Sequence, residues 1–397
     1  MHTLVRATDT ADTAEALHEL SGALAAERPT PPRFLAVYTS TGHDAEAVRE
    51  HFAATGVEAI HGGTSCLGVM AGGRMCSNDG RGIGFFALWD DAGAYGTGIA
   101  LLGTDPREAA RRAVTRALEA AGRTGEAPDL VWLTAAPGAE ESLIAGIEDV
   151  IGSNAPIIGG SAADNDLSGA WRVFDGDITV GAGVAVSVLF PSRAVATAYQ
   201  SGYAPTAKTG TVSRVEGRKV LGIDGRPALE VYADWTKGAV APDTTDGPEM
   251  ILSASTFHPL GRHVGDIADV PFYLLAHPAT ANPDRSIDLF ADVELGEEVT
   301  LMTGSADSLV SRAGRVASLS AKRGGLTTAD IAGALVIFCG GCMLAVRDRM
   351  DEVAAEVDRA LGGAPSLGIF TFGEQGAVLG ESNRHGNLMI SCVTFAR

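Results

Sequence analysis

The pattern of apolar positions repeats three times along the chain: an apolar run, an amphipathic segment, and a second apolar run that ends in glycine. The apolar runs have the length and composition of strands, and the segments between them have the periodicity of helices. Each copy extends over roughly 30 residues, the length that a β-α-β unit needs because its helix must travel back along the sheet. The copies comprise residues 34–63, 130–160 and 334–368.

Each copy is followed by further strand-like runs in which apolar and polar residues alternate. This alternation predicts strands that pair antiparallel with the β-α-β units. The runs lie at 82–89 after the first copy, at 171–174 and 183–190 after the second, and at 387–395 after the third.

Two other apolar runs, at 98–102 and 299–302, each lead into a predicted helix. Asp105 can cap the first helix, with Pro106 at its first position, and Ser305 can cap the second. Small apolar residues line one face of both helices, which indicates close packing on a sheet. We therefore expect these two strand-helix pairs to be equivalent elements of the repeats.

The segment 195–292 does not follow the pattern of the repeats. It has short predicted strands, frequent Gly and Pro, and one helix signal at 227–234. Because 397 residues exceed the size at which a single hydrophobic core keeps growing, we expect two domains, 1–194 and 195–397. The predicted fold class is α/β. Two associated domains are built from repeated β-α-β plus antiparallel strand units, with mixed sheets covered by helices.

Composition and charge exclude several classes of protein. Hydrophobic residues make up 46% of the chain and charged residues 20%, as in ordinary globular proteins. The net charge of −19 repels phosphate backbones and anionic lipids, so we expect neither nucleic acid nor membrane partners. Residues 1–10 contain no basic region leading into an apolar stretch, and no run is long enough to span a bilayer. We expect a cytoplasmic protein.

The glycine-rich strand ends form the first candidate binding site. Gly63 and Ser65 lie at the end of the first copy, and Gly160 and Ser161 lie at the end of the second. Backbone amides and hydroxyl groups at such positions can bind a carboxylate or a phosphate. The alternative is a tight turn that every copy shares and that has no role in binding.

The cysteines do not form a disulfide pattern, so we expect reduced thiols. Cys339 and Cys342 have the spacing of a redox or zinc half-site, but no second close cysteine pair completes a zinc site. Because the pair follows an apolar strand, buried thiols are the expectation. His258, His263 and His277 have no carboxylate at a diagnostic spacing, so we predict no metal site there.

Polar residues near the end of the chain form the second candidate site. Glu374, directly after Gly373, ends an apolar strand, where a carboxylate either meets water or contacts a ligand. His385 and Asn387 follow a loop rich in Gly, Ser and Asn, so Asn387 either satisfies turn backbone or binds the ligand. His385 is a candidate metal or haem ligand only if an apolar cavity lies beside it.

The same region carries a resemblance to a known family. The stretch 334–397, with its Gly-Glu pair and its later His and Asn, resembles the end of the FIST C-terminal domain. The stretches 223–235 and 259–261 resemble the beginning of that domain. The turn 62–65 is similar to the glycine-rich turn of the FIST N-terminal domain. The likeness covers nearly the whole chain.

The resemblance implies a bacterial-type sensory module, not an enzyme, that binds an amino acid or a small carboxylate and relays its occupancy to a signalling protein such as a histidine kinase. Some family members look like haem-binding nitric oxide sensors, so haem held by His385 is one alternative. A thiol-dependent enzyme using Cys339 or Cys66 is another, although Walker, zincin, nucleophile-elbow and complete dinucleotide motifs are absent. The expected ligand contacts are Gly63, Ser65, Gly160, Ser161, Cys339, Gly373, Glu374, His385 and Asn387.

Overall fold

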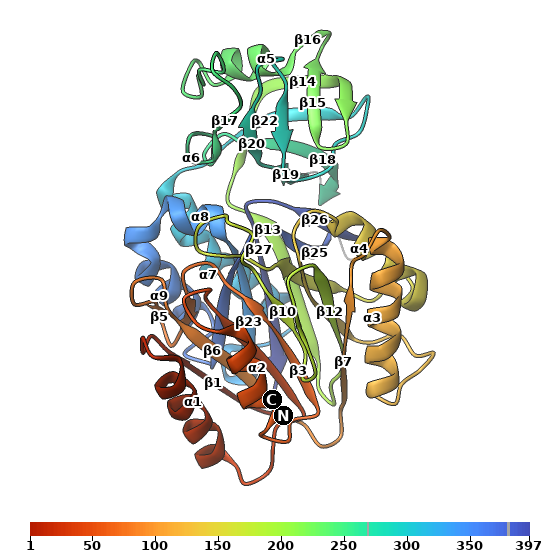
Figure 1. The fold of residues 1–397 in the computed structure, drawn as a ribbon, viewed down its shortest axis with the longest axis vertical. Helices are drawn as coiled ribbons and strands as arrows, with labels where there is room; N and C mark the ends of the chain where they lie inside the picture. The colour runs from red at the N-terminus through yellow and green to blue at the C-terminus, as the bar shows by residue number, and fades with distance from the viewer. Residues whose placement is uncertain (268–269, 379–381) are drawn as a thin grey trace.

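The computed structural model describes residues 1–267, 270–378 and 382–397. These residues form three mixed six-stranded sheets, which make up a core, and a smaller β-rich domain that stands on one end of it (Figure 1). Helices cover the outside of the core, and both chain termini lie at the end away from the smaller domain. The predicted fold class, α/β with mixed sheets covered by helices, is confirmed.

Each core sheet is built mainly by one unit of the chain, and the three units share one order of elements. A first strand and helix lead into a β-α-β element, and a last strand completes the unit. Unit 1 comprises β1 (His2–Thr8), α1 (Thr13–Glu27), β2 (Phe34–Thr39), α2 (Ala45–Ala53), β3 (Ala59–Thr64) and β6 (Ile83–Trp89). Unit 2 comprises β7 (Ala94–Leu101), α3 (Pro106–Ala120), β8 (Leu130–Ala135), α4 (Glu140–Ile151), β9 (Ile157–Ser161) and β12 (Gly183–Phe190). Unit 3 comprises β13 (Val195–Ser201), α7 (Ala306–Arg323), β23 (Ile331–Cys339), α8 (Gly340–Ala345), α9 (Met350–Ala360), β24 (Ser366–Thr371) and β27 (Met389–Ala396).

Strand pairing follows the sequence pattern. The central strands β2, β8 and β23 run parallel to β3, β9 and β24 and antiparallel to β6, β12 and β27. The predicted repeats and their antiparallel partners are therefore confirmed. One helix differs: the segment predicted as a single helix contains a 3-10 turn (Arg347–Arg349) before α9, and α8 precedes it. Two glycines at the start of α8 have low helix propensity, so no local pattern indicates this helix.

Short polar residues begin the helices as predicted. The Asp105 side chain accepts a hydrogen bond from the Glu108 amide at the start of α3. Ser305 begins α7 in a reciprocal pair of hydrogen bonds with Ser308. Such caps satisfy amides that have no partner within the helix, and each contributes about 1 kcal/mol.

A hairpin before the last strand of each unit pairs with the sheet of a different unit. The hairpin of unit 1 extends the unit 3 sheet at β24, that of unit 2 extends the unit 1 sheet at β3, and that of unit 3 extends the unit 2 sheet at β9. The exchange is cyclic, so it interleaves the two halves of the chain, and the division into 1–194 and 195–397 stays a prediction. The hairpin strands are β4 (Val69–Ala71), β5 (Arg74–Cys76), β10 (Val173–Phe174), β11 (Thr179–Val180), β25 (Glu374–Val378) and β26 (Ser382–Gly386).

The inner faces of the three sheets share one hydrophobic core. Phe34 of β2, Trp132 of β8 and Leu335 of β23 are buried in the same cluster. The outer faces pack against α1 and α2 in unit 1, α3 and α4 in unit 2, and α7 and α9 in unit 3. Burying a side chain of this size contributes about 1.5–3 kcal/mol, so the shared core holds the units together.

The smaller domain is an insertion in unit 3 between β13 and α7. It begins inside the segment 195–292, whose pattern differs from that of the repeats, and it extends beyond that segment to Thr303. It begins with β14 and ends with β22, which pair antiparallel with Ala204 opposite Thr303, so both connections to the core lie side by side. Its elements are β14 (Ala204–Glu216), β15 (Lys219–Ile223), β16 (Arg226–Pro227), α5 (Ala228–Trp235), β17 (Glu249–Met250), α6 (Leu252–Ser255), β18 (Leu260–Ile267), β19 (Val270–Ala276), β20 (Pro278–Ala281), β21 (Ile287–Leu289) and β22 (Glu298–Thr303).

The predicted equivalence of the runs 98–102 and 299–302 is wrong. The first run lies in β7, at the edge of a core sheet, whereas the second lies in β22, between β14 and β18 of the inserted domain. The place of β7 is taken in unit 3 by β13, which pairs with β27. A short apolar run has the same periodicity in any sheet, so the pattern alone could not assign it.

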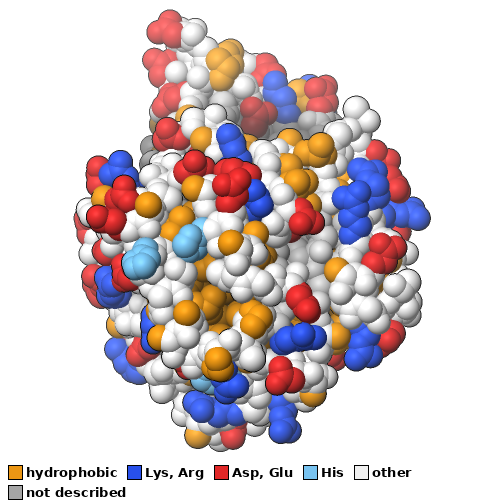
Figure 2. Space-filling model, turned by 60° about the horizontal axis from the view of Figure 1, so that its bottom comes forward, with side chains coloured by type: hydrophobic (Ala, Val, Ile, Leu, Met, Phe, Trp, Pro, Cys, Tyr) orange, Lys and Arg blue, Asp and Glu red, His pale blue; other side chains and the backbone are white. Residues whose placement is uncertain are grey.

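The surface combines both signs of charge with an acidic excess. On the face that Figure 2 turns toward the reader, Lys and Arg side chains are dispersed among Asp and Glu. The net charge of the whole chain is −19. Within the described ranges, no helix combines the length and the apolar character needed to cross a membrane.

Candidate ligand-binding cavity

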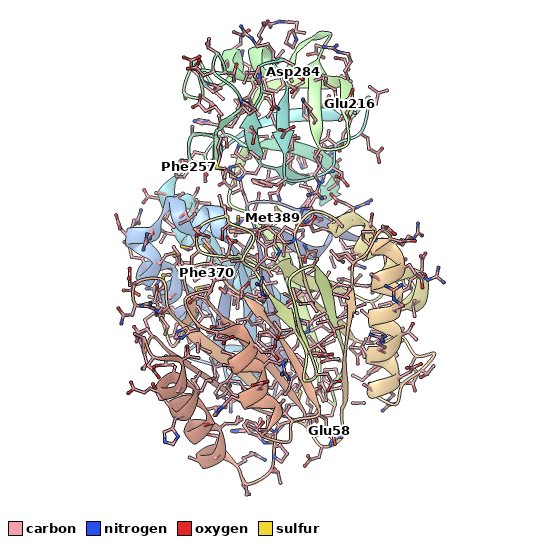
Figure 3. The ribbon with its side chains drawn as sticks, in the orientation of Figure 1. Glu58, Glu216, Phe257, Asp284, Phe370 and Met389 are labelled. Carbon is pink, nitrogen blue, oxygen red and sulfur yellow. The ribbon has the colours of Figure 1, made fainter. Side chains whose placement is uncertain are left out.

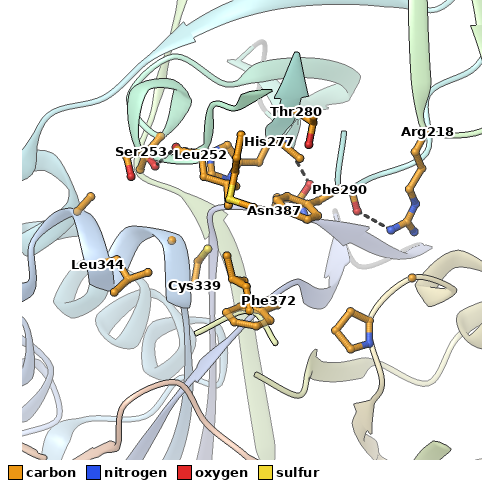
Figure 4. Close-up of a pocket in the computed structure, with 18 of the residues that line it drawn as sticks. Arg218, Leu252, Ser253, His277, Thr280, Phe290, Cys339, Leu344, Phe372 and Asn387 are labelled. Carbon is orange, nitrogen blue, oxygen red and sulfur yellow. Dashed lines mark hydrogen bonds between the residues drawn. The ribbon is translucent and has the colours of Figure 1, made fainter. Parts of the chain in front are cut away.

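A cavity of about 690 Å³ lies between the inserted domain and the core (Figure 4). Loops that follow core strands form one side of it, and residues of the inserted domain form the other. From the core, the lining is Pro137, Gly138, Glu140, Leu167, Trp171, Cys339, Gly341, Leu344, Ala345, Phe372 and Asn387. From the inserted domain, it is Arg218, Met250, Leu252, Ser253, Thr256, Phe257, His277, Ala279, Thr280 and Phe290.

The ends of β9 and β24 are joined beneath the cavity. The Ser161 amide donates to the Gly373 carbonyl at 2.8 Å, and the Phe372 amide donates to the Ser161 carbonyl at 3.0 Å. Gly160 allows this approach, because an added Cβ would lie 2.3 Å from Cγ2 of Thr371. Carboxyl ends of parallel strands are where α/β sheets commonly place ligands, and here two sheets present such ends to one cavity.

One end of the cavity is charged. Glu140, the first residue of α4, is buried, and its Oε1 accepts from the Gly138 amide at 3.0 Å and the Ser161 hydroxyl at 2.7 Å. Its Oε2 accepts from Nη2 of Arg218 at 2.8 Å. Burial by itself raises the pKa of Glu140, but the charges of His385 and Arg218 and these hydrogen bonds outweigh burial and lower it to about 2. Glu140 is therefore ionised at neutral pH.

Arg218 connects the two parts of the protein. It lies between β14 and β15 of the inserted domain, and its Nη2 also donates to Oε2 of Glu141 in the core at 2.9 Å. Within the inserted domain, Nε donates to Asp292 at 2.8 Å and Nη1 donates to the Phe290 carbonyl at 2.7 Å. Figure 4 shows this side chain directed from the inserted domain toward the core. Arg218 thus forms ion pairs across the boundary beside the cavity.

The rest of the cavity is mainly apolar and aromatic. The Trp171 and Phe372 rings meet edge to face, with centroids 6.4 Å apart. On the opposite side, Phe290 packs against His277 at 6.0 Å. Burial lowers the pKa of His277 to about 4, so this imidazole is neutral at pH 7. The cavity therefore offers an aromatic surface together with one charged end.

Cys339 lines the cavity at the end of β23, and Glu374 lies behind it. Burial raises the pKa of the Cys339 thiol well above its ordinary value, and Cys342 raises it further. The Glu374 carboxyl is fully buried and accepts from the Thr371 hydroxyl at 2.9 Å and the Met389 amide at 3.0 Å. Burial, followed by the neighbouring Cys339, raises the pKa of Glu374 well above its ordinary value. Burial thus favours the neutral form of both groups.

The structure gathers most of the predicted contacts near the cavity. Cys339 and Asn387 line it. The Asn387 side-chain oxygen accepts from the His277 amide at 3.1 Å, which links unit 3 to the inserted domain. The predicted contacts that do not line the cavity but lie within the neighbouring hydrogen-bonded strand ends are Gly160, Ser161, Gly373, Glu374 and His385.

Gly63 and Ser65 lie away from the cavity. The Ser65 hydroxyl donates to the Gly68 carbonyl at 2.6 Å and accepts from the Phe370 amide at 2.9 Å, so it joins unit 1 to unit 3. An added Cβ at Gly63 would lie 2.7 Å from Cγ2 of Thr134. Both positions have a packing role in the structure.

The residues present do not fit a haem held by His385. This side chain is 2% exposed and does not line the cavity. Its Nδ1 lies 3.3 Å from the Gln375 amide nitrogen, and its Nε2 lies 3.4 Å from the Phe290 carbonyl oxygen. Haem ligation requires a ring nitrogen that is free to face an apolar pocket. In the part of the chain that the structure describes, no group of three or more His, Cys, Asp or Glu side chains is arranged to hold a metal ion.

Comparison with protein families shows to which family the chain belongs. A model of the FIST N domain matches residues 33–226, and a model of the FIST C domain matches residues 228–377. The two matches follow one another and together cover most of the sequence. The chain belongs to the FIST family.

Comparison with curated proteins and with solved structures gives little for this FIST chain. No curated protein matches it. Cyanuric acid hydrolase from A. caulinodans is similar at a TM-score of 0.36 and 12% identity, over 99% of this chain and 98% of the other. PurLQS from Thermotoga maritima is similar at a TM-score of 0.22 and 8% identity, over 78% of this chain and 73% of the other. Likenesses this weak carry no argument about ligand or activity.

Sequence reasoning missed the charged and aromatic lining of the FIST cavity. Neither Glu140 nor Arg218 stands in a motif that indicates a site, because the two residues are 78 positions apart in the sequence and meet only in the folded protein. No local pattern reports a contact of that kind. Trp171 begins a run whose pattern predicts a strand, and Phe372 lies directly before Gly373, so the sequence alone does not distinguish either residue from a core aromatic residue.

Proposed function

We propose that this FIST protein is a sensor that binds a small organic molecule in the cavity between its inserted domain and its core. The observation that supports this proposal most is that both parts contribute to the lining, with Glu140 on one side and Arg218 on the other. A ligand held there contacts both parts at once. Occupancy therefore changes the relative free energies of the arrangements of the two parts.

The size and chemistry of the cavity favour a small amphipathic molecule. A volume of about 690 Å³ falls within the range of metabolite-sized sites, which are mostly apolar with a few placed polar groups. Amino acids and small carboxylates, the ligands that the FIST resemblance implies, are of suitable size. Leu167, Met250 and Leu344 are exposed leucine and methionine side chains at the cavity, and such exposed apolar groups are typical of binding sites.

The relay to a partner follows from the way the inserted domain is attached. Its two connections lie side by side at Ala204 and Thr303, so a small change there moves the whole domain. The ion pairs of Arg218 hold the domain against the core until a ligand alters them. The proposed partner is a cytoplasmic signalling protein such as a histidine kinase, and the acidic surface favours a basic patch on it.

A thiol-dependent enzyme is the competing function. Cys339 faces the cavity, which favours this alternative, but its raised pKa keeps the thiol protonated, and a thiolate is the nucleophilic form. The neighbouring acid, Glu374, has its own pKa raised, because burial disfavours the ionised form that would have to accept the proton of the thiol. Burial also raises the pKa of Cys66 to about 12. Activity toward acyl or redox substrates that disappears in Cys339→Ala would favour the enzyme.

A thermal-shift screen tests the sensor proposal. Amino acids and small carboxylates are added to wild-type protein, to Leu344→Trp, and to Leu295→Trp as a matched control. Both leucines are exposed, but Leu344 lines the cavity and Leu295 does not. We expect a ligand to raise the midpoint of wild type and Leu295→Trp and to raise that of Leu344→Trp far less. Equal shifts in all three proteins would contradict binding in the cavity.

An absorption spectrum tests the haem alternative separately. A Soret band in the purified or hemin-treated protein that is lost in His385→Ala would favour a haem sensor. Protein that does not take up hemin would remove this alternative.

A further inference from the structure

The charges around the cavity favour one class of ligand. Three carboxylates, those of Glu140, Glu141 and Asp292, bind the single guanidinium of Arg218. These four side chains therefore carry a formal excess of two negative charges, and a protonated His385 beside Glu140 would reduce that excess to one. The nearby guanidinium of Arg262 does not offset it, because it lies 3.9 Å from Glu297 and so has its own counter-charge.

The donors of Arg218 are also largely occupied. Its Nε donates to Asp292, its Nη1 donates to the Phe290 carbonyl, and its Nη2 donates to both Glu140 and Glu141. A carboxylate ligand would have to compete with these partners and with their negative charge. Glu140 and Arg218 are the charged members of the lining within the described residues, and His277 is neutral.

The aromatic lining adds a second preference for positive charge. Faces of aromatic rings attract cations, and this attraction grows when the site excludes water. The rings of Trp171, Phe257, Phe290 and Phe372 belong to the same cavity as the Glu140 carboxylate. Aromatic rings beside an ionised acid are the usual surroundings of an organic ammonium group in proteins.

We infer that the ligand is an organic cation, an amine or ammonium compound with an apolar body, whose charged group binds beside Glu140. This inference rests on the proposed sensor function and names the ligand class of the same cavity. Glu140 attracts the cation, and Glu141 and Asp292 strengthen the attraction through the field they add. The aromatic side chains contact the apolar body. An amino acid binds through its ammonium group, and a small carboxylate without an amine binds poorly.

Three probes that share a phenylethyl body separate charge from shape: 2-phenylethylamine, 2-phenylethanol and 3-phenylpropionate. Their dissociation constants are measured by isothermal titration at low and at physiological salt. We expect the amine to bind at least about ten-fold more tightly than the carboxylate, with the alcohol between them. The preference shrinks at higher salt, because partly exposed charges such as Asp292 are screened.

Variants show whether the acidic cluster causes the preference. Glu140→Gln removes the nearest charge, and the double variant Glu141→Gln with Asp292→Asn reduces the field while keeping the buried Glu140–Arg218 pair. Both variants should lower the ratio of amine to carboxylate affinity at least three-fold. Glu58→Gln is the matched control, because this exposed glutamate lies at the far end of the core (Figure 3) and should leave the ratio unchanged.

The outcomes separate the ligand class from the sensor function. If the alcohol or the carboxylate binds as tightly as the amine, and Leu344→Trp weakens that binding, the inference is overturned and the sensor proposal stands. If none of the three probes binds at millimolar concentration, the inference is overturned and the cavity loses support as a binding site. An unchanged ratio in both acidic variants would also overturn it.

Discussion

Arg218 Nη2 lies 2.8 Å from Glu140 Oε2, and this contact joins the inserted domain to the first residue of α4 in the core. The Glu140 side chain is 2% exposed and that of Arg218 is 21% exposed, so water screens the pair only in part. A partly buried ion pair at the boundary between two parts is suited to a sensor, because a ligand beside it can strengthen or replace it.

Arg218→Met should loosen the inserted domain and destabilise the core around α4. The substitution leaves the buried Glu140 carboxylate without its cationic partner, which costs about 3 kcal/mol. Urea unfolding at pH 7 measures the loss. The double variant Arg218→Met with Glu140→Gln removes both charges and should recover part of the stability. A double variant less stable than Arg218→Met would contradict the pairing.

His61 should make stability depend on pH. Its ring is fully buried between the hydroxyls of Ser187, at 2.9 Å, and Thr134, at 2.8 Å, and burial lowers its pKa from 6.5 to about 3. Between pH 6.5 and pH 3 the unfolded chain therefore binds a proton at His61 that the folded protein does not bind. The contribution of His61 to stability is fully present above pH 6.5 and is lost as the pH falls toward 3. One such proton contributes a slope of about 1.4 kcal/mol per pH unit.

The test compares wild type with His61→Gln by urea unfolding between pH 7 and pH 4. The slope of the free energy of unfolding against pH should be smaller in the variant, by up to the contribution of one proton. Part of the slope should remain, because burial also lowers the pKa of His277, to about 4. An identical slope in the two proteins would mean that His61 does not titrate as described.

Glu374→Gln should not lower the stability of the protein at neutral or higher pH. Burial and Cys339 raise the pKa of Glu374, so the ionised form is disfavoured in the fold. Stability from this group is present below the unfolded pKa near 4.5 and is lost as pH rises, whereas glutamine carries no charge at any pH. We expect Glu374→Gln to equal or exceed wild type in stability at pH 8 and to lose that advantage toward pH 4.

Glu374→Ala is the contrasting variant. It removes the acceptor of the Met389 amide and should cost about 1–3 kcal/mol. Titration calorimetry with a cavity ligand should give nearly the same affinity for Glu374→Gln and wild type, because Glu374 does not line the cavity. A ten-fold weaker affinity in Glu374→Gln would show that its carboxyl contacts the ligand directly.

Local elements could be predicted from the sequence because their signals are local. Helix α4 (Glu140–Ile151) lies inside the predicted copy 130–160, and the parallel pairing of β8 with β9 follows from the length of that copy. The glycine-rich strand ends do approach one another, since Gly160 and Glu374 are paired in the unit 2 sheet. Repetition in the chain was enough to predict the parallel pairing inside each unit, but not the pairing of Gly160 with Glu374 between units.

The cyclic exchange of hairpins and the make-up of the cavity could not be predicted in the same way. β25 pairs with β9 of another unit, and Arg218 reaches Glu140 from an inserted domain, so both contacts depend on tertiary packing. Glu374 illustrates the limit: an acid at the end of an apolar strand looks like a ligand contact in sequence, yet β27 and Thr371 supply its partners and bury it.

A ligand in the cavity is expected to move the inserted domain relative to the core. Spin labels on Glu58→Cys and Glu216→Cys, at opposite ends of the molecule in Figure 3, report that distance, and the five native cysteines are buried. The account predicts that a saturating cavity ligand shifts and narrows the distance distribution, and that Arg218→Met broadens it. An unchanged distribution at verified saturation would contradict the claim.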